Sequence, residues 1–257
     1  RDIGIALRSG WLTLYYQPKL TAKGLLLKGV EALARWHDPV KGTISPAQFI
    51  AVAERHGLID ALTRHLLDIA LQQKQQWQRR GVSFNVAFNL SPLSLADPTL
   101  VDWIAQLTAQ YGVAPGEITL EVTENALLGE LASSIQTLAR LRLKGFGVAI
   151  DDYGSGFANA QQLSRVPATE LKIDRALVHN VATRPQQRTI LRNTVEMAHQ
   201  LQLVTVAEGV EHREDFDLLR QLNVELIQGY FLAKPMPADK LMQWMQTDLA
   251  SLRKQLR

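Results

Sequence analysis

The sequence GVAIDDYGSGF, residues 147–157, is an apolar run that ends at two adjacent carboxylates and continues into a glycine-rich segment. The apolar residues suit a strand that is buried on both faces. Gly154 and Gly156 allow the backbone that follows to turn sharply or to approach a ligand closely. Taken alone, Asp151 and Asp152 could form an ordinary acidic turn. The stretch indicates a functional site because the rest of the chain repeats this arrangement of apolar strand and polar end.

The length and composition are those of an ordinary globular domain. The chain has 257 residues, 46% of them hydrophobic and 21% charged, and single α/β barrels have about this length. Its formal net charge is +3, and the Lys and Arg residues are spread along the sequence, which argues against a nucleic-acid polymer as partner. The absence of Cys excludes disulfides and thiolate metal sites and fits a reducing compartment.

No targeting or membrane-spanning segment is apparent in the sequence. No apolar run approaches the roughly 20 residues that cross a bilayer, and no signal peptide precedes the first expected element. We therefore expect a cytoplasmic location and no membrane contact from this segment. The sequence begins at Arg1 rather than Met. We expect one domain over residues 1–257, cut from a larger signalling protein whose other part holds a regulatory, sensory or membrane-anchoring region.

Strand-like and helix-like segments alternate along the whole chain. Expected strands cover residues 12–17, 25–36, 82–90, 118–124, 147–152, 170–174, 203–209 and 225–229. Expected helices cover residues 2–9, 60–80, 99–111, 131–144, 161–167, 186–201, 214–222 and 238–252, and a further helix starts at Pro46. Pro18 is expected to end the first strand, so that residues 19–24 form a turn. About eight strand–helix units in this length favour an α/β fold of the (β/α)8 barrel type.

Polar residues mark the ends of successive expected strands. They are Glu31, Asn89, Glu121, Asp151 with Asp152, Lys172, Glu208 and Gln228. Each is separated from the next by enough residues for one crossover through a helix. The carboxyl ends of the parallel strands of a barrel meet on one face, where active sites lie. We therefore expect these residues to converge.

Carboxylates that converge in one mouth repel one another and raise their own pKa values unless cations are present. The sequence offers one interior cation, Lys172, which is not enough. Oxygen ligands without Cys or His favour hard divalent ions such as Mg²⁺ or Mn²⁺ over Zn²⁺. Asp151 and Asp152 point different ways from one backbone position, so they could serve two ions about 3.5–4 Å apart, as in two-metal phosphoryl transfer. The residues alone predict a metal-dependent hydrolase, most simply one that acts on phosphate esters.

The strand-end residues lie in segments that together resemble the EAL domain. In chain order the segments are Glu31-Ala32-Leu33 with Ala34-Arg35-Trp36, Asn89-Leu90-Ser91, Glu121-Val122-Thr123-Glu124, Asp151-Asp152-Tyr153-Gly154-Ser155-Gly156, Leu171-Lys172-Ile173-Asp174, Ala207-Glu208-Gly209-Val210-Glu211 and Gln228-Gly229-Tyr230. The likeness runs from about Trp11 to Pro237, nearly the whole chain. The first three residues alone would carry no weight, whereas the ordered set is specific.

The resemblance implies a phosphodiesterase that opens the bacterial second messenger cyclic-di-GMP to linear 5′-pGpG. It implies a modified (β/α)8 barrel whose first strand is antiparallel to the others, with two ions, Mg²⁺ or Mn²⁺, in each active site. Carried over by position, the ligands of the first ion are Glu31, Asn89, Glu121 and Asp151. Asp152 would bind the second ion with help from Glu208.

The resemblance also assigns roles to residues around the ions. Lys172 would hold or polarise the attacking water and Glu208 would assist its deprotonation, and which of the two is the principal base stays open. Gln228 would position the water or the metal shell. Arg35 would meet a phosphate with its fixed fork of donors. Gln17 would line the substrate groove.

Glu124 lies just beyond its strand, where the family uses its counterpart to hold the loop after the two aspartates. This loop departs mildly from the family pattern, with little change in size and polarity, at Tyr153, Ser155 and Phe157. The family often dimerises through this loop and the neighbouring helices, so a homodimer is expected. Loop motion and its coupling to the dimer could differ in this chain.

Alternatives remain for the function and for single residues. One is a catalytically silent receptor that binds cyclic-di-GMP and relays the signal to a partner domain, although relatives of that kind usually lack a strand-end acid. Another is a different metal barrel that acts on an unrelated phosphoester. Glu31 could instead form a buried salt bridge with Arg35 or Lys28. The His residues show no ligand spacing, so surface or packing roles are expected for them.

Overall fold

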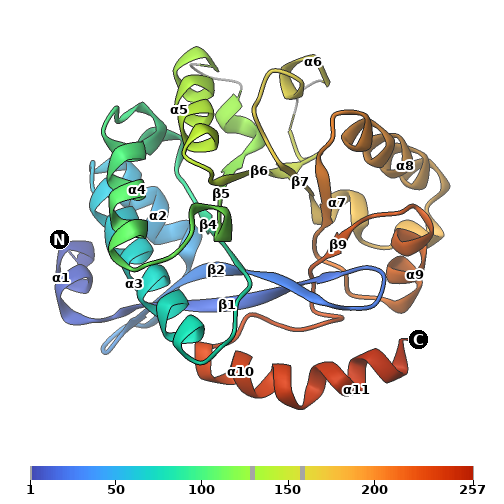
Figure 1. The fold of residues 1–257 in the computed structure, drawn as a ribbon, viewed down its shortest axis with the longest axis horizontal. Coiled ribbons are helices and arrows are strands. Elements are labelled where there is room, and N and C mark those ends of the chain that lie inside the picture. The colour runs from blue at the N-terminus through green and yellow to red at the C-terminus, as the bar shows by residue number, and fades with distance from the viewer. Residues whose placement is uncertain (1, 128–130, 157–159, 257) are drawn as a thin grey trace.

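Strands and helices alternate around a closed barrel, with the helices on the outside (Figure 1). The computed structural model describes residues 2–127, 131–156 and 160–256. Its strands are β1 (Leu12–Thr21), β2 (Leu27–Asp38), β3 (Gly42–Ile44), β4 (Asn85–Asn89), β5 (Ile118–Thr123), β6 (Gly147–Tyr153), β7 (Glu170–Ile173), β8 (Val204–Ala207) and β9 (Leu226–Ile227). Its α-helices are α1 (Asp2–Ser9), α2 (Pro46–Arg55), α3 (Ile59–Arg79), α4 (Leu100–Gln110), α5 (Leu131–Leu143), α6 (Ala160–Leu163), α7 (Arg175–Val178), α8 (Pro185–Gln200), α9 (Arg213–Gln221), α10 (Ala238–Gln246) and α11 (Asp248–Gln255). Short 3₁₀ helices are η1 (Pro92–Ala96), η2 (Pro115–Glu117), η3 (Glu124–Leu127) and η4 (Val181–Thr183).

The strands form one sheet that closes on itself. Around the ring the order is β1-β9-β8-β7-β6-β5-β4-β2, and the pairing of β1 with β2 closes it. β1 is antiparallel to both of its neighbours, whereas the other neighbouring pairs of the ring are parallel. β3, which the sequence did not predict, folds back on the end of β2 as an antiparallel hairpin. The expected modified barrel with an antiparallel first strand is confirmed.

β1 is longer than the sequence predicts, because Pro18 lies within it. The strand continues to Thr21, so the turn expected directly after Pro18 is wrong. Alternate residues of a strand direct their N–H groups to the same side. On the side away from β2, Tyr16 donates its N–H to the Met236 carbonyl, and pairing with β9 begins at Leu20. The missing N–H of Pro18 therefore falls where β1 needs no ladder hydrogen bond.

Helices cover the outside of the barrel and bury the apolar core against it. On α3, Trp77 packs against Tyr16 and Phe84, with ring centroids 4.8 and 4.9 Å away. α10 and α11 lie along the outer side of β1 and β2 (Figure 1). The closing helix expected over residues 238–252 is divided between these two helices at Thr247. Within the described residues, no helix combines the length and the apolar character that a bilayer-spanning segment needs.

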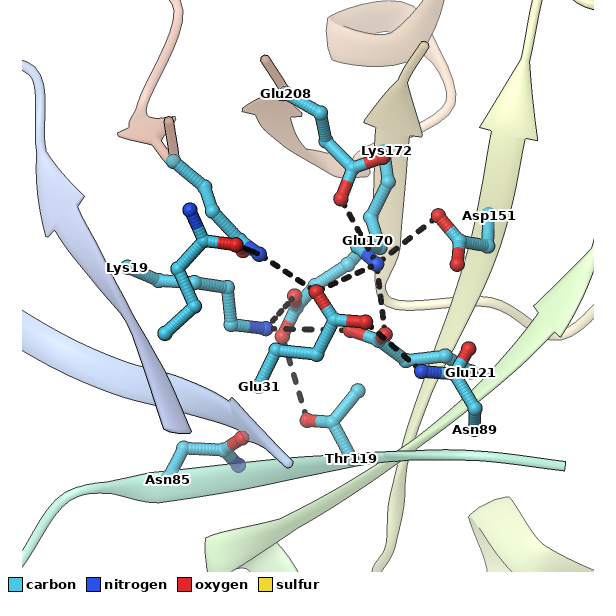
Figure 2. A network of polar contacts seen from close by, with 12 residues as sticks. Lys19, Glu31, Asn85, Asn89, Thr119, Glu121, Asp151, Glu170, Lys172 and Glu208 are labelled. Atoms are coloured by element: carbon cyan, nitrogen blue, oxygen red, sulfur yellow. Dashed lines mark hydrogen bonds and ion pairs between the residues drawn. The ribbon is translucent and has the colours of Figure 1, made fainter. Parts of the chain in front are cut away.

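The inside of this barrel is polar, whereas Val, Ile and Leu usually fill barrels of this type. Buried Lys19, Thr119, Glu121 and Lys172 lie within it (Figure 2). Gly147 leaves room for this filling, since a Cβ there would lie 2.5 Å from Thr119 Oγ1. The strands therefore hold a network of ionisable groups inside the barrel.

Candidate active site

Carboxylates from several strands converge on the ammonium group of Lys172 (Figure 2). Its Nζ atom lies 2.7 Å from Glu121 Oε2, 2.9 Å from Asp151 Oδ1, 3.0 Å from Glu208 Oε1 and 3.5 Å from Glu31 Oε2. The acids come from β2, β5 and β6 and from the residue that follows β8, and the lysine comes from β7. Residues far apart in the sequence thus meet towards the carboxyl ends of the parallel strands, where barrel active sites lie.

Glu31 is held in place by two amide side chains. Asn89 Nδ2 donates to Glu31 Oε1 at 2.8 Å, and Gln228 Nε2 donates to Glu31 Oε2 at 2.6 Å. The alternative interpretation of Glu31 was a buried salt bridge with Arg35 or Lys28. Among the described residues Glu31 pairs instead with Lys172. Glu31 is therefore oriented towards the cluster of acids by its own hydrogen bonds.

Gln228 is fixed in turn by a buried amide contact. Its Nε2 also donates to Gln17 Oε1 at 3.1 Å, and Gln17 Nε2 donates to the Ala233 carbonyl oxygen at 3.1 Å. The backbone of Gly229, the residue after Gln228, passes close to Val210, since a Cβ on Gly229 would lie 2.2 Å from the Val210 carbonyl oxygen. Gln17 lines the same cavity as Gln228 but is only 7% exposed, so its clearest contact is with Gln228.

A second lysine lies inside the barrel. Lys19 Nζ is 3.1 Å from Glu170 Oε2 and 3.6 Å from Glu121 Oε1 (Figure 2). The expectation that Lys172 is the one interior cation is wrong, because Lys19 belongs to β1 and not to a turn after Pro18. The missed signal was the two-residue step from Gln17 to Lys19, which puts both side chains on one face of an extended strand.

The two lysines do not neutralise the acids around them. Burial raises the pKa of Glu121 to about 8, with Lys172 opposing and Glu31 adding to the shift. Burial also raises the pKa of Glu208 well above its ordinary value. Burial acts on Glu31 in the same direction, but Lys172 and the hydrogen bond from Gln228 outweigh it and lower the pKa of Glu31. The site therefore favours the binding of further positive charge.

Asp151 and Asp152 reach the same site through a local irregularity of β6. In a regular strand, adjacent side chains point to opposite faces. The pairing of β6 with β7 shifts register between Ile150 and Tyr153, and Asp152 has a left-handed backbone with φ of 56°. Bulges of this kind re-aim side chains, and Asp enters the left-handed region more readily than most residues. As a result, one oxygen each of Asp151, Asp152 and Glu208 lie within 4.8 Å of one another.

The acids form two groups that share Asp151. The first contains Glu31, Glu121 and Asp151, the second contains Asp151, Asp152 and Glu208, and within each group the ligand atoms lie within 4.8 Å. Burial, followed by the charge of Asp151, raises the pKa of Asp152 to about 6. The donors are oxygens, which suit Mg²⁺ or Mn²⁺. The groups fit two divalent cations.

Two polar atoms beside these groups support the fit. Glu121 Oε1 and Gln228 Oε1 are buried, and neither has a hydrogen-bond partner among the described residues, although Lys19 Nζ lies 3.6 Å from Glu121 Oε1. Buried oxygens normally have a partner, so such atoms are suited to a cation or its water shell. Asn89 lies next to Glu31 but donates to it, so its amide would have to turn to present Oδ1 as a ligand.

Glu124 holds the loop that follows Asp152. Its Oε2 accepts hydrogen bonds from the backbone N–H groups of Gly154 at 2.9 Å and Gly156 at 3.4 Å. Glu124 is buried, and a Cβ on Gly156 would lie 2.8 Å from its Oε1. Glu124 is therefore placed against the loop and outside both groups of acids. Phe157, where the loop also departs from the family pattern, lies outside the described residues.

Arg35 lies beside the site and not among its acids. Its guanidinium donates to the Ala34 carbonyl oxygen at 2.8 Å and lies over the Tyr15 ring, 5.2 Å from the centroid. Arg35 and Asn89 line a mainly apolar cavity of about 270 Å³. A second cavity, of about 260 Å³, is lined by Glu31, Glu208 and Gln228, and Leu33 lines both. The acidic site therefore borders two adjoining cavities.

A cavity of about 690 Å³ lies at the other end of the barrel. Its lining includes Thr21 at the end of β1 and Glu170 and Val204 at the starts of β7 and β8. Barrel chemistry is located at the opposite, carboxyl-terminal end of the parallel strands. Cavity volume is therefore a poorer indicator of the active site in this barrel than the position of the acids.

The fold and the site define an α/β barrel that presents a site of oxygen ligands for hard divalent cations at the carboxyl ends of its strands. Comparison with known protein families places this barrel more narrowly. The family model described as EAL domain matches residues 1–235. The chain belongs to the EAL domain family, as the ordered motifs predicted.

Named relatives cover almost all of this chain. MucR of Pseudomonas aeruginosa, described as a bifunctional diguanylate cyclase/cyclic di-GMP phosphodiesterase, is 38% identical over 242 residues, 94% of this chain and 35% of its own. RocR of the same organism, described as a cyclic di-GMP phosphodiesterase, is 34% identical over 95% of this chain and 62% of its own. The chain thus spans about a third to under two thirds of these relatives. A solved structure of the MucR phosphodiesterase in complex with c-di-GMP is 38% identical, with a TM-score of 0.88 over 93% of this chain and 98% of that one.

Proposed function

We propose that this domain hydrolyses cyclic-di-GMP to linear 5′-pGpG with the help of two divalent cations, Mg²⁺ or Mn²⁺. The observation that carries the proposal is the pair of acidic groups that share Asp151, at the carboxyl ends of the barrel strands. Membership of the EAL domain family and the names of the relatives support the choice of nucleotide. A mononuclear binding site would not need the bulge that turns Asp152 towards Glu208.

The ligands follow from the two groups of acids. Glu31, Glu121 and Asp151, with Asn89 once its amide has turned, would hold the first cation. Asp152 and Glu208 would hold the second, with Asp151 shared. Bound there, the cations supply Lewis acidity to a water molecule and neutralise charge on the phosphodiester.

The chain's own side chains provide positioning and proton transfer. Lys172 is surrounded by carboxylates within 3.5 Å, which keep it protonated, so it acts as a donor that holds the attacking water. Glu208 is 16% exposed and lines the cavity beside the acids, where it can take the proton of that water. Gln228, held by Gln17, orients Glu31 and the water.

Two adjoining cavities provide room for a substrate with two nucleotide halves. Arg35 borders one of them and has the donor geometry that suits a phosphate, once it releases the Ala34 carbonyl. Gln17 borders the other. Leu33 lines both cavities, so they meet beside it. A substrate that spans them would have its scissile phosphodiester next to Glu31.

The direct test is turnover by the folded chain. The chain is mixed with cyclic-di-GMP and Mg²⁺ or Mn²⁺, and pGpG is measured by chromatography. Product is expected with the ions and none after EDTA treatment. Glu31→Ala and Asp151→Ala are expected to weaken metal binding and to abolish turnover. A folded chain that forms no pGpG with either ion contradicts the proposal.

Other outcomes distinguish the alternatives. Tight binding of cyclic-di-GMP without turnover in either ion favours the silent receptor that relays binding to a partner domain. Cleavage of simple phosphodiesters without preference for the cyclic dinucleotide favours an unrelated phosphoesterase. The chain retains every acid that the ligand sets require, which supports the catalytic proposal over the receptor.

We also propose that the domain is regulated through a homodimer and through other domains of a longer protein. The loop after Asp152 is the element that links the surface to the acids, because Glu124 ties it down. The greater length of MucR and RocR supports the presence of other domains. Light scattering tests the dimer, and a monomer that turns over substrate at full rate contradicts it.

A further inference from the structure

Two imidazoles and a carboxylate meet outside the acidic site, on the loops that follow β7 and β8. His179 follows α7, whereas Glu211 and His212 directly precede α9. One ligand atom from each of the three lies within 4.8 Å of the others. The two imidazole centroids are 5.5 Å apart. The spacing of the His residues along the sequence did not predict that these two would meet.

The nitrogen of His179 that faces this cluster lacks a hydrogen bond. His179 Nδ1 is buried and has no hydrogen-bond partner among the described residues. It lies 3.7 Å from Glu211 Oε2, beyond the range of an N–H···O bond. Two ligands that each lie about 2.1 Å from one tetrahedral ion are roughly 3.4 Å apart. The separation is therefore nearer to that of two ligands of one ion than to that of a hydrogen-bonded pair.

The loops that hold the three side chains are fixed before any ion binds. Asp215, on α9, accepts hydrogen bonds from the backbone N–H groups of Asn180 and Ala182, both at 2.9 Å. Arg175 NH2 lies 3.0 Å from Glu211 Oε1 and leaves the other oxygen, Oε2, directed to His179. Such outer contacts orient ligands and reduce the ordering cost of binding a metal.

The donor set selects a different class of ion from the acidic site. Two imidazole nitrogens and one carboxylate oxygen, with a further position open to water, are a common ligand set for Zn²⁺. Mg²⁺ and Mn²⁺ prefer oxygen ligands and compete poorly for imidazole. His212 is exposed and makes no capping hydrogen bond at the start of α9, and its ring already lies beside that of His179.

We propose that His179, Glu211 and His212 bind one divalent cation of the Zn²⁺ class at a site separate from the two acidic groups. The site lies on the segment that carries Glu208. Gly209 packs against the stem of Arg175, and Arg175, Glu208 and Glu211 line one cavity. An ion bound there ties this wall of the cavity to the loop after α7. The proposal holds whether or not the domain is a phosphodiesterase.

The test measures Zn²⁺ binding while the acidic site is occupied. EDTA-treated protein is saturated with Mg²⁺ and titrated with Zn²⁺ by calorimetry, and Co²⁺ is used in parallel because its visible absorption reports imidazole ligation. One Zn²⁺ per chain is expected. His212→Ala and His179→Ala are each expected to weaken binding at least about tenfold and to reduce the Co²⁺ band.

Matched variants separate this site from others on the chain. His199→Ala removes an imidazole that pairs with Glu225 elsewhere on the barrel, at 2.9 Å, and is expected to leave Zn²⁺ affinity unchanged. Asp151→Asn removes the acid shared by both acidic groups and is also expected to retain Zn²⁺. Circular dichroism establishes that each variant is folded. Unchanged Zn²⁺ affinity in folded His212→Ala, or its loss in Asp151→Asn, overturns the proposal.

Discussion

Lys172 is the residue around which the acids are arranged, and its environment explains why they are suited to bind cations. Four carboxylates among the described residues lie within 3.5 Å of its Nζ atom, and Lys19 compensates further charge from the side of Glu170. Breaking a buried ion pair by removing one partner costs about 3–5 kcal/mol, because a charge is left uncompensated. Four carboxylates share one ammonium group, so part of their negative charge is uncompensated without further cations. The cluster is therefore suited to bind divalent ions.

Glu208→Gln is the substitution that isolates proton transfer. It keeps the shape and one carbonyl oxygen of the side chain but removes the basic carboxylate. The turnover number is expected to fall about 100-fold or more, while the dissociation constant for cyclic-di-GMP in Ca²⁺ or EDTA changes less than about threefold. Glu214→Gln, at an exposed position on α9, is the control and should behave as wild type. A near-normal rate in Glu208→Gln would show that Glu208 is not the base.

At the scale of elements, the end of β6 and its loop decide whether Asp152 joins the site. The register shift between β6 and β7 and the left-handed φ of Asp152 place two adjacent carboxylates on one side. The loop after them is tied to buried Glu124 through the backbone N–H groups of Gly154 and Gly156. Hydrogen bonds to a charged acceptor contribute about 1.5–3 kcal/mol, enough to order such a loop.

Glu124→Ala is expected to loosen this loop without unfolding the barrel. Amide hydrogen exchange of Gly154 and Gly156 should speed up at least about tenfold, and affinity for the second cation should fall, because Asp152 loses its fixed backbone. Hydrogen exchange followed by mass spectrometry or NMR measures the first effect, and Mg²⁺ titration measures the second. Ser155→Ala removes one side-chain hydrogen bond, at 2.8 Å from the Asp152 carbonyl, and serves as a milder control in the same loop. Unchanged exchange in Glu124→Ala would rule out the proposed clamp.

At the scale of the whole molecule, the barrel places ionisable groups where other barrels place apolar layers. Lys19, Glu170 and Thr119 continue the network from the acidic site towards the opposite end of the barrel (Figure 2). The apolar core is displaced to the layer between strands and helices, where Trp77 and its neighbours pack. Stability of this fold should therefore respond to pH and to divalent ions more than that of a barrel with an apolar interior.

Without divalent ions, the free energy of unfolding is expected to decrease as pH rises from about 5 to 8. The pKa values of Asp152 and Glu121 are raised to about 6 and about 8, so the folded chain keeps protons that the unfolded chain has already lost. The free energy of unfolding then falls as pH rises from the pKa of each group in the unfolded chain to its pKa in the folded chain. Glu31 and Lys172 do not contribute between about pH 5 and 8. The pKa of Glu31 is lowered from its ordinary value and that of Lys172 is raised, so both titrate outside this range.

Urea denaturation at pH 5, 6, 7 and 8 measures this effect. In EDTA a loss of about 2 kcal/mol or more is expected across the range, from the buried acids together. In saturating Mg²⁺ the slope is expected to flatten or reverse, because cations replace the protons and bind the folded state. Stability that rises with pH in EDTA would contradict the raised pKa values.

The sequence by itself determined the barrel and most of the polar residues at the ends of its strands, although Glu31 lies within β2 and not at its end. Alternating apolar strands and amphipathic helices are local patterns, and a carboxylate that ends an apolar run is visible without a structure, as Glu121 and Asp151 show. Ordered motifs identified the EAL family because their sequence and spacing are carried by one chain. These features depend on neighbours in sequence, so they can be read from it.

Only the tertiary structure decided which side chains share a space. Lys19 lies inside the barrel because β1 continues beyond Pro18. The strand can continue there because pairing with β9 begins only at Leu20, so no hydrogen bond from residue 18 is needed. Asp152 turns towards Glu208 because β6 is irregular against β7. His179 and His212 meet because parallel strands bring successive loops to one end of the barrel. Each of these depends on the register and closure of the sheet, which arise from contacts between residues far apart in the chain and leave no local pattern.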